Sequence, residues 1–210
     1  MDLVLFGPPA AGKGTQAARL TDLLKVPQIS TGDMMRTEKK SGSDLGQKFA
    51  DYMEKGLLVP DEMVGELIKK RLGQDDAKNG AIFDGYPRTV AQAELLDSIL
   101  TELGRKVDKV VSIEVSLETV VERISGRRTD PSTGQVYHLT YNPPPVDFGG
   151  ELAQRKDDTP DVVRERYKGY ENKTLPVLPY YEAKELVAAV DGVGSLDEVT
   201  ERIKAAIGTS

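Results

Sequence analysis

The sequence contains no cysteine, and its only histidine is His138. Without cysteine the chain can form neither a disulfide bond nor a cysteine-ligated zinc site, and one histidine cannot build a metal centre alone. A lone histidine is more often a surface or structural residue than a ligand, so we expect no bound zinc. The chain also lacks any run of about 18 apolar residues, so no membrane-spanning helix is expected.

An excess of basic residues is missing as well. The 210 residues include 28 lysines and arginines against 34 aspartates and glutamates, for a net charge of −6. General nucleic-acid binders are usually basic, so that class is disfavoured. The N-terminus leads directly into an apolar segment, without the basic region and cleavage site of a signal peptide. We therefore expect a cytoplasmic protein that binds neither nucleic acid nor a membrane. Its length suits one α/β core with insertions, or two small domains.

The most informative segment that is present is the glycine-rich stretch 7–15, GPPAAGKGT. It follows the apolar run 3–6 and precedes Ala17, Leu20 and Leu24, whose spacing places them on one face of a helix. The order of strand, glycine loop and helix is typical of a phosphate-binding loop, in which backbone N–H groups and a helix N-terminus surround an anion. The stretch therefore predicts a nucleotide phosphate site near the start of the chain.

Two side chains of this stretch carry the expected chemistry. Lys13 can follow a phosphoryl group as a mobile point charge, and the Thr15 hydroxyl can lie near the β-phosphate or its magnesium ion. The common form of the motif has serine or threonine directly after the lysine, where this chain has Gly14. The alternative is a glycine turn that merely joins a strand to a helix. The strand, the helix and the lysine register together favour the nucleotide site.

Short apolar runs alternate with helical patterns along the rest of the chain. Strands are predicted at 3–6, 27–29, 81–83, 110–113 and 186–190. Strands that alternate with helices predict a parallel sheet covered on both faces, and such sheets bind ligands beyond the carboxyl ends of their strands. The segments at Gly7, Thr31 and Asp84 all follow strands, so they should meet at one edge of the sheet.

Two stretches do not fit this alternation. Residues 30–59 have a helical but polar pattern. Residues 127–158 are rich in proline and glycine, and around His138 they alternate as Val136, Tyr137 and Leu139. The second stretch predicts short strands and turns that are too small for an independent core. A long irregular insertion in a compact domain is commonly functional, often a lid. A disordered linker is the alternative, which the regular alternation disfavours.

In order, these motifs resemble those of the adenylate kinases from end to end. The matching segments are 7–17, 30–36, 58–62, 83–89 with Gln92, 123–128, 155–158 and 163–166. The resemblance implies an α/β fold in which a five-stranded parallel sheet forms a P-loop kinase core with an α-helical AMP-binding insert and a small β-rich lid. The implied domains are a core of residues 1–29, 60–122 and 159–210, an AMP-binding insert of 30–59 and an ATP lid of 123–158.

The implied activity is the reversible, Mg²⁺-dependent transfer of a phosphoryl group from ATP to AMP, giving two ADP, by a monomer. Asp33 and Asp84 match family positions that bind Mg²⁺ through its water ligands, which suits an ion that prefers phosphate oxygens and keeps several waters. Catalysis is assigned to Lys13, Arg88, Arg127, Arg155 and Arg166. The residues assigned to ATP are Ala10, Ala11, Gly12, Lys13, Gly14, Thr15, Arg123, Arg127, Val136, Tyr137 and Gly194. Those assigned to AMP are Thr31, Arg36, Leu57, Leu58, Val59, Gly85, Arg88, Gln92, Arg155 and Arg166.

Arginine suits phosphate because its planar fork binds two oxygens and does not lose its proton. Arg127, Arg155 and Arg166 come from the start of the lid, its end and the following helix, so we expect only lid closure to bring them together. A surface ion pair is the alternative for any single arginine. That alternative is preferred for Arg71, Arg105 and Arg164.

The sequence departs from the family pattern at two places. Most relatives have glycine where Ala10 stands, and alanine is strained there if the position needs a positive φ. Many relatives carry zinc ligands in the lid, whereas this lid resembles the metal-free type that polar side chains hold. The candidates for that polar network are Asp130, Ser132, Thr133 and Asp147, with ordinary solvated turn residues as the equally weighted alternative. Asp157 and Asp158 similarly resemble either lid-hinge residues or arginine-orienting residues, with solvated charges as the equally weighted alternative.

Three rival functions are considered. A UMP/CMP kinase shares this fold, and Thr31 favours AMP over pyrimidine acceptors by resemblance. A catalytically silent nucleotide sensor would need affinity but not the whole arginine set. A switch GTPase would need an Asn-Lys-x-Asp segment that reads guanine, and the sequence contains none.

Overall fold

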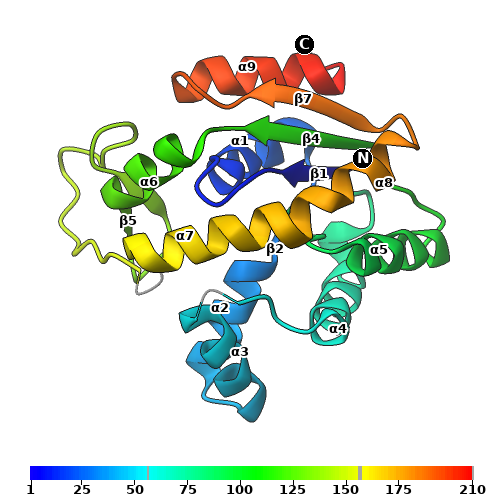
Figure 1. Ribbon diagram of the computed structural model, residues 1–210, viewed down its shortest axis with the longest axis horizontal. Coiled ribbons are helices and arrows are strands. Elements are labelled where there is room, and N and C mark those ends of the chain that lie inside the picture. Colours follow the sequence, from blue (N-terminus) through cyan, green and yellow to red (C-terminus); the bar gives the residue numbers. More distant parts are fainter. Residues whose placement is uncertain (56, 156–157, 210) are drawn as a thin grey trace.

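The computed structural model describes residues 1–55, 57–155 and 158–209. Its centre is a five-stranded parallel sheet with the strand order β2-β3-β1-β4-β7 (Figure 1). The strands are β1 (Asp2–Phe6), β2 (Gln28–Ser30), β3 (Ala81–Asp84), β4 (Lys109–Glu114) and β7 (Val187–Asp191). Each coincides with a predicted run to within one residue at its start, and the predicted five-stranded parallel sheet is confirmed.

Strand β1 lies in the middle of the sheet because it pairs with β3 on one side and β4 on the other. All of its residues are buried, as expected for a parallel strand that is covered on both faces. Successive side chains point to opposite faces. Leu3 and Leu5 therefore join one hydrophobic cluster, and Val4 and Phe6 join the other. The glycine loop thus starts from the most enclosed strand of the molecule.

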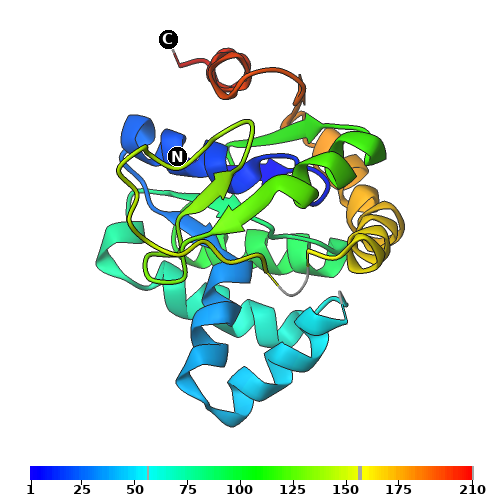
Figure 2. The same ribbon diagram turned by 90° about the vertical axis from the view of Figure 1, so that its left-hand side faces the viewer.

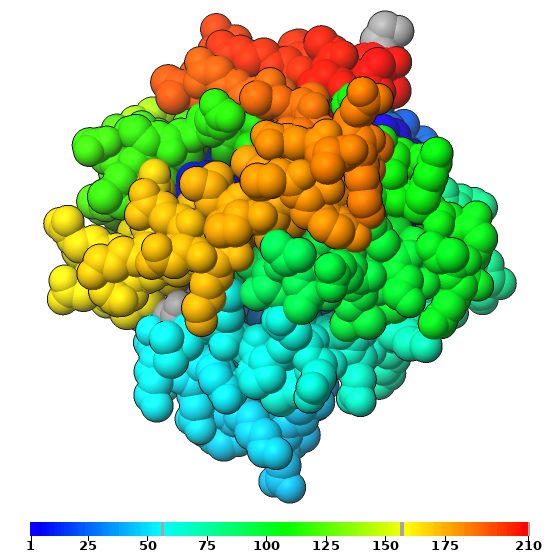
Figure 3. Space-filling view, turned by 45° about the vertical axis from the view of Figure 1, so that its right-hand side comes forward, coloured from blue at the N-terminus to red at the C-terminus, as the bar shows by residue number. Residues whose placement is uncertain are grey.

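Helices cover both faces of this sheet. Helices α1 (Lys13–Leu24) and α9 (Leu196–Ile207) contribute to the cluster of Leu3 and Leu5. The cluster of Val4 and Phe6 is completed by α4 (Asp61–Leu72), α5 (Val90–Glu102) and α8 (Leu178–Glu182). Helix α6 (Leu117–Gly126) packs on α7 (Pro160–Gly169) through Val120, Ile124 and Val163. From α7 a continuous helical path runs through Tyr170–Thr174 and Leu175–Val177 into α8 and crosses the molecule in Figure 3.

A pair of helices projects from one end of the core. Helices α2 (Thr31–Ser41) and α3 (Asp44–Glu54) hang below the sheet and are attached to it through β2 (Figures 1 and 2). They pack closely because Gly46 lies against the Glu38 carbonyl. A Cβ atom at that position would be 2.3 Å from the Glu38 oxygen. The helical pattern of residues 30–59 is therefore confirmed as two short helices.

A small antiparallel ribbon forms the second projection. Strands β5 (Arg127–Thr129) and β6 (Val136–His138) pair with each other, as the short alternation predicts (Figure 2). Their turn is held by Asp130, which accepts hydrogen bonds from the Ser132 hydroxyl at 2.6 Å and the Thr133 hydroxyl at 2.7 Å. These bonds, that of Ser132 first, lower the pKa of Asp130 to about 2. Three of the four predicted network residues are confirmed.

For Asp147, the fourth candidate for the lid network, the alternative of a solvated turn residue applies. Its side chain is exposed, and no hydrogen bond or ion pair of the described chain involves it. It lies in the segment between β6 and α7, which here makes only scattered bridges to the ribbon, such as the pairing of Ala153 with Thr129. The local bonds of Asp130 are thus sufficient to close the turn.

Candidate active site

The loops after β1, β2 and β3 meet at one edge of the sheet, as predicted. The Thr31 hydroxyl at the end of β2 donates a hydrogen bond to the Gly85 carbonyl after β3, at 3.0 Å. A Cβ atom at Gly14 in the glycine loop would lie 3.2 Å from an Asp84 carboxylate oxygen. Segments that are 54 and 70 positions apart in the sequence thus meet at the carboxyl ends of the strands.

The glycine loop has the backbone conformation that an anion site needs. Gly7 has a φ of 143°, and a Cβ atom there would lie 2.5 Å from the Ile113 carbonyl oxygen. Gly12 precedes α1 with a φ of 98°, and no side chain caps the helix start. The first N–H groups of α1 can therefore donate hydrogen bonds to a bound phosphate.

Ala10 has a φ of 55°, which is the left-handed region. The predicted strain at this position is confirmed, because a left-handed conformation costs an L-residue other than glycine roughly 1–2 kcal/mol. Ala10 also packs beside the small cluster of Val120, Ile124 and Val163, so its methyl group recovers part of that cost through burial.

Lys13 folds back into the glycine loop. Its ammonium group donates hydrogen bonds to the carbonyl oxygens of Gly7 at 2.8 Å and Pro8 at 2.7 Å. Burial lowers the pKa of Lys13 to about 8, although the negative charge of Asp84 opposes the shift. The neighbouring positive charges of Arg88 and Arg166 add to the lowering. The lysine is therefore placed within a cluster of cations that an incoming phosphate would stabilise.

Asp84 is held by a residue that the sequence did not single out. The Gln28 side-chain amide donates a hydrogen bond to an Asp84 oxygen at 3.0 Å. Burial raises the pKa of Asp84, and the positive charge of Lys13 opposes the rise. Gly14 has little space beside this carboxylate, which gives a physical reason for glycine where the common motif has serine or threonine. Gln28 could have been found only from its pairing with β3, not from any motif.

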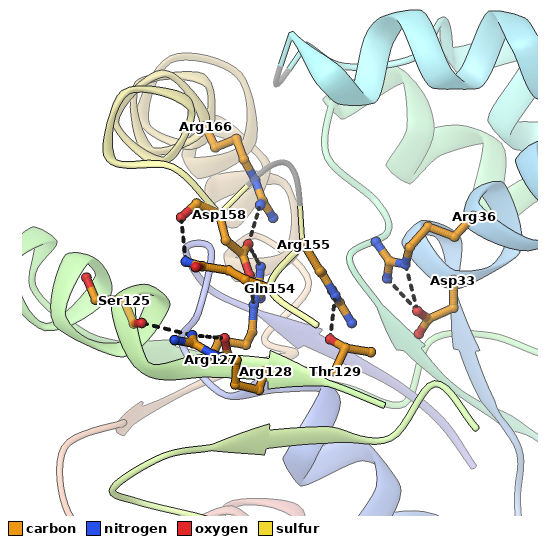
Figure 4. A network of polar contacts seen from close by, with 10 residues as sticks. All are labelled: Asp33, Arg36, Ser125, Arg127, Arg128, Thr129, Gln154, Arg155, Asp158 and Arg166. Carbon is orange, nitrogen blue, oxygen red and sulfur yellow. Dashed lines mark hydrogen bonds and ion pairs between the residues drawn. The ribbon is translucent and has the colours of Figure 1, made fainter. Parts of the chain in front are cut away.

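Asp33 and Arg36 lie on the first turns of α2 and contact each other (Figure 4). The Arg36 Nε atom donates to an Asp33 oxygen at 3.1 Å, and a second guanidinium nitrogen contacts the same oxygen. Partial burial would raise the pKa of Asp33, but the charge and hydrogen bonds of Arg36 outweigh it and hold the pKa below its usual value. Asp33 also influences the pKa of Asp84, so the two predicted magnesium-site carboxylates lie near each other.

Two of the predicted catalytic arginines share one buried carboxylate. Arg127 donates to Asp158 with its Nε at 2.8 Å and with a second nitrogen, and an Arg166 nitrogen lies 4.0 Å from the same group (Figure 4). Asp158 is only 2% exposed. The interpretation of Asp158 as an arginine-orienting residue is confirmed, and the alternative of a solvated charge is wrong. Lys156 and Asp157 of the same motif lie outside the described residues.

Two of the three arginines lie together in this conformation. Asp158 holds Arg127 and Arg166 at one point, because a buried carboxylate needs cationic partners. That lid closure brings all three around the transferring group stays a prediction. Arg155 lies between this group and the pair formed by Asp33 and Arg36 (Figure 4). Its Nε atom donates to the Thr129 hydroxyl at 3.1 Å. Burial, and then the charges of Arg36 and Arg127, lower the pKa of Arg155 to about 10.

A pocket beside these cations is lined by nine of the ten residues assigned to AMP. Arg155 is the exception. The lining residues predicted from the sequence are Thr31, Arg36, Leu57, Leu58, Val59, Gly85, Arg88, Gln92 and Arg166. Met35, Met53 and Val64 complete its apolar side and were not predicted. Arg88 is anchored by its Nε, which donates to the Gly85 carbonyl at 2.8 Å. One end of the pocket is thus cationic and another apolar, as a nucleoside monophosphate requires.

The residues assigned to the ATP base are less completely assembled. Arg123 donates to the carbonyl oxygens of Ala11 at 3.3 Å and Gly192 at 2.8 Å, and so joins the glycine loop to the turn before Gly194. Tyr137 instead packs on Phe148, with ring centroids 5.4 Å apart. Within the described chain no hydrogen bond or ring contact joins Val136 or Tyr137 to Arg123.

His138 has a structural role in this conformation, which agrees with the expectation for a lone histidine. Its Nδ1 atom accepts hydrogen bonds from the backbone N–H groups of Thr140 and Tyr141, both at 3.0 Å. The ring packs on Tyr141 and against Gly126, where a Cβ atom would be 2.4 Å from Nε2. Burial lowers the pKa of His138.

One arginine outside the motifs was interpreted wrongly. Arg105 was expected at the surface, yet its side chain is 14% exposed and forms a buried ion pair with Asp2. It also donates to the Ala77 carbonyl at 2.6 Å. Arg71 forms its expected ion pair with Asp76, and Arg164 is exposed on α7. Arg105 therefore stabilises the fold at the opposite edge of the sheet.

The chain is similar to known proteins along nearly its whole length. A sequence model of the family named Adenylate kinase matches residues 5–186. This chain belongs to the adenylate kinase family. It is 49% identical to an adenylate kinase of Archaeoglobus fulgidus over 98% of this chain and 97% of that protein. It is 46% identical to an adenylate kinase of Caldicellulosiruptor bescii over 99% of each chain. An adenylate kinase of Sorangium cellulosum is 49% identical over 99% of this chain and 97% of that protein.

Membership of the adenylate kinase family confirms the resemblance and the P-loop kinase fold. No described helix is long and apolar enough to cross a membrane. In the part of the chain that the structure describes, no group of three or more histidine, aspartate or glutamate side chains could hold a metal ion.

Proposed function

We propose that this protein transfers a phosphoryl group reversibly from ATP to AMP, giving two ADP. The proposal is carried by the position of the pocket that Thr31 and Gln92 help to line. Its lining includes Arg88 and Arg166, whose charges also act on Lys13 in the glycine loop. An acceptor phosphate placed at Arg36 and Arg88 would face a donor phosphate placed at Lys13. The names of the family and of the full-length relatives support ATP and AMP as the substrates.

Phosphoryl transfer needs positioning and charge neutralisation more than covalent chemistry. We assign these tasks to Lys13, Arg88, Arg127, Arg155 and Arg166. Burial is the main cause of the lowered pKa of Lys13, and the charges of Arg88, Arg166 and Arg127 add to it. The charge of Arg127 also acts on Arg155, so the five cations lie near one another. In the transition state, negative charge spreads over the oxygens of the moving group, and a preorganised set of cations stabilises that state without reorganising.

Further residues bind the two nucleotides. We propose that the donor phosphates lie on the backbone of residues 10–15, with Arg123 and Gly194 beside the ATP base. Val136 and Tyr137 would reach this base when residues 123–158 close as a lid. Residues 30–59 would close over AMP from the other side, while residues 1–29, 60–122 and 159–210 act as the fixed core. Closure would exclude water, which otherwise would accept the phosphoryl group.

The residues at the site fit a magnesium ion that arrives with the nucleotide. Among the described residues Gln28 donates one hydrogen bond to Asp84, and the charges of Lys13 and Arg88 favour its ionised form, so its oxygens can still accept hydrogen bonds from ion-bound waters. Asp33 lies near it and is kept ionised by Arg36. A pair of carboxylates suits an ion that keeps its waters and phosphate ligands. When bound, Mg²⁺ would neutralise charge on the transferring phosphates.

A coupled assay with ATP and a panel of monophosphates tests the function. We expect AMP to exceed UMP, CMP and GMP clearly in kcat/KM. Turnover of UMP equal to or above that of AMP would overturn the proposal in favour of a pyrimidine kinase. ATP binding without transfer to any monophosphate would instead indicate a nucleotide sensor. A monomer in the cytoplasm remains our prediction for its state and location.

A further inference from the structure

The side-chain amide of Gln92 is held at both of its ends. Its oxygen accepts a hydrogen bond from the Arg88 backbone N–H at 2.7 Å, and its nitrogen donates to a carboxylate oxygen of Asp61 at 2.7 Å. Gln92 is 3% exposed and borders the pocket assigned to AMP. An amide has two donor hydrogens and two acceptor positions, so these bonds leave one of each available to a ligand.

The chemistry of the two partners determines which end of the Gln92 amide is the oxygen and which is the nitrogen. A carboxylate can only accept, so Asp61 must face the amide nitrogen. A backbone N–H can only donate, so Arg88 must face the amide oxygen. Exchanging the two ends would place oxygen against oxygen at Asp61 and hydrogen against hydrogen at Arg88. Gln92 therefore presents its donor and acceptor to the pocket in a single order.

Asp61 is itself held firmly. Its second carboxylate oxygen accepts a hydrogen bond from the Thr89 hydroxyl at 2.8 Å. The same hydroxyl accepts the Gln92 backbone N–H at 3.1 Å, as the cap of α5. Asp61 begins α4, so its negative charge also lies at a favourable helix end. The carboxylate thus cannot turn away to accommodate a reversed amide.

We propose that Asp61 is a positioning residue that gives the acceptor site its selectivity for 6-aminopurines. Adenine offers a donor at N6 and an acceptor at N1, which an amide matches with its oxygen and nitrogen. Hypoxanthine and guanine offer the reverse order, an acceptor at O6 and a donor at N1. Against these bases the fixed amide places its oxygen opposite O6 and its N–H opposite the N1 hydrogen, so neither forms a hydrogen bond. Buried polar groups without a hydrogen-bond partner weaken binding. The inference rests on the proposed function, because it takes AMP as the acceptor.

Replacing Asp61 by asparagine tests this role. The Asp61→Asn side chain can turn either its oxygen or its nitrogen to Gln92, so it no longer forbids the reversed amide. The assay measures kcat/KM for AMP and for IMP, whose base reverses the two groups of adenine. We expect the ratio of AMP to IMP to fall on the order of tenfold, because one charge-assisted hydrogen bond no longer opposes reversal. The Arg88 N–H still favours the original orientation of the amide, so kcat/KM for IMP should rise but stay below that for AMP.

Glu62→Gln is the matched control. Glu62 is the next residue, is exposed and loses the same charge from the first turn of α4, so its variant should keep the wild-type ratio. An Asp61→Asn enzyme whose activities with AMP and IMP change in proportion would show a merely structural Asp61 and overturn the inference. If that variant does not fold, Asp61→Ser supplies the same comparison, since a hydroxyl also donates or accepts. A wild-type enzyme that fails to phosphorylate AMP would refute the proposed function instead.

Discussion

Asp158→Asn is the substitution that most directly tests how the arginines are held. The change keeps the size of the side chain but removes the negative charge that Arg127 and Arg166 share. Removing one partner of a buried ion pair costs about 3–5 kcal/mol. The lower end applies here, because the Arg127 side chain is 15% exposed and asparagine can keep one hydrogen bond. We expect a loss of about 3 kcal/mol in the free energy of unfolding.

That loss can be measured as a change in melting temperature. In a chain of this length about 1 kcal/mol corresponds to roughly 2–4 °C, so Tm should fall by roughly 6–12 °C. The kcat should fall by about 10–100-fold, because cations displaced by about 1 Å no longer match the transition state. ATP affinity should not weaken, since its phosphates no longer compete with a carboxylate for the arginines. Calorimetric unfolding and steady-state kinetics measure both effects.

The result that would refute this reasoning is specific. An Asp158→Asn enzyme with wild-type Tm and wild-type kcat would mean that the arginines need no orienting anion. A variant that lost ATP affinity in proportion to kcat would mean that Asp158 supports the binding surface in general. A fall in kcat together with unchanged or tighter ATP binding is the pattern that the geometry predicts.

Three further predictions concern the same site. Alanine at Arg127, Arg155 or Arg166 should lower kcat by on the order of 10³, and by a smaller factor where neighbouring cations share the charge. The control Arg164→Ala, on the exposed face of α7, should behave like wild type. Losses of ATP affinity as large as the losses in kcat would contradict this prediction. The pKa of Lys13 lies at about 8, below its value in the unfolded chain, so burial of the cation lowers the folding stability below about pH 8, and this loss is relieved as pH rises toward the unfolded pKa. The kcat/KM should decline above about pH 8, because the cation is lost. A kcat/KM that stays constant up to pH 10 would contradict a catalytic Lys13 cation. Metal analysis should find zinc far below one equivalent per chain, and a stoichiometric ion would refute a metal-free lid.

The sequence was sufficient for the parts of the site that lie within continuous motifs. The glycine loop, Thr31 and Asp84 were placed correctly because each follows a strand, and parallel strands end at one edge. At Ala10 the family resemblance, which places glycine there, raised strain only on the condition of a positive φ, and the structure meets that condition. These features depend on local order along the chain, which spacing and residue type reveal directly.

Contacts between distant segments could not be predicted. Gln28 and Asp84 are separated by 56 positions, and Arg105 is separated from Asp2 by 103. No periodicity links such pairs, because their proximity results from the order of strands in the sheet. Arg105 was consequently mistaken for a surface residue. For the same reason the role of Asp158 remained open until its burial beside Arg127 was known.

The length of β2 has a consequence for how the molecule opens. This edge strand contains only three residues and is the sole sheet element from which α2 and α3 extend in Figure 1. Besides this short strand, Met35 and Phe49 join the pair to the core by packing in the cluster of Val4 and Phe6, whereas β1 is enclosed between two neighbouring strands. Native-state hydrogen exchange should accordingly show two classes of amides. Those of α2 and α3 should exchange through local opening, and those of β1 only through global unfolding.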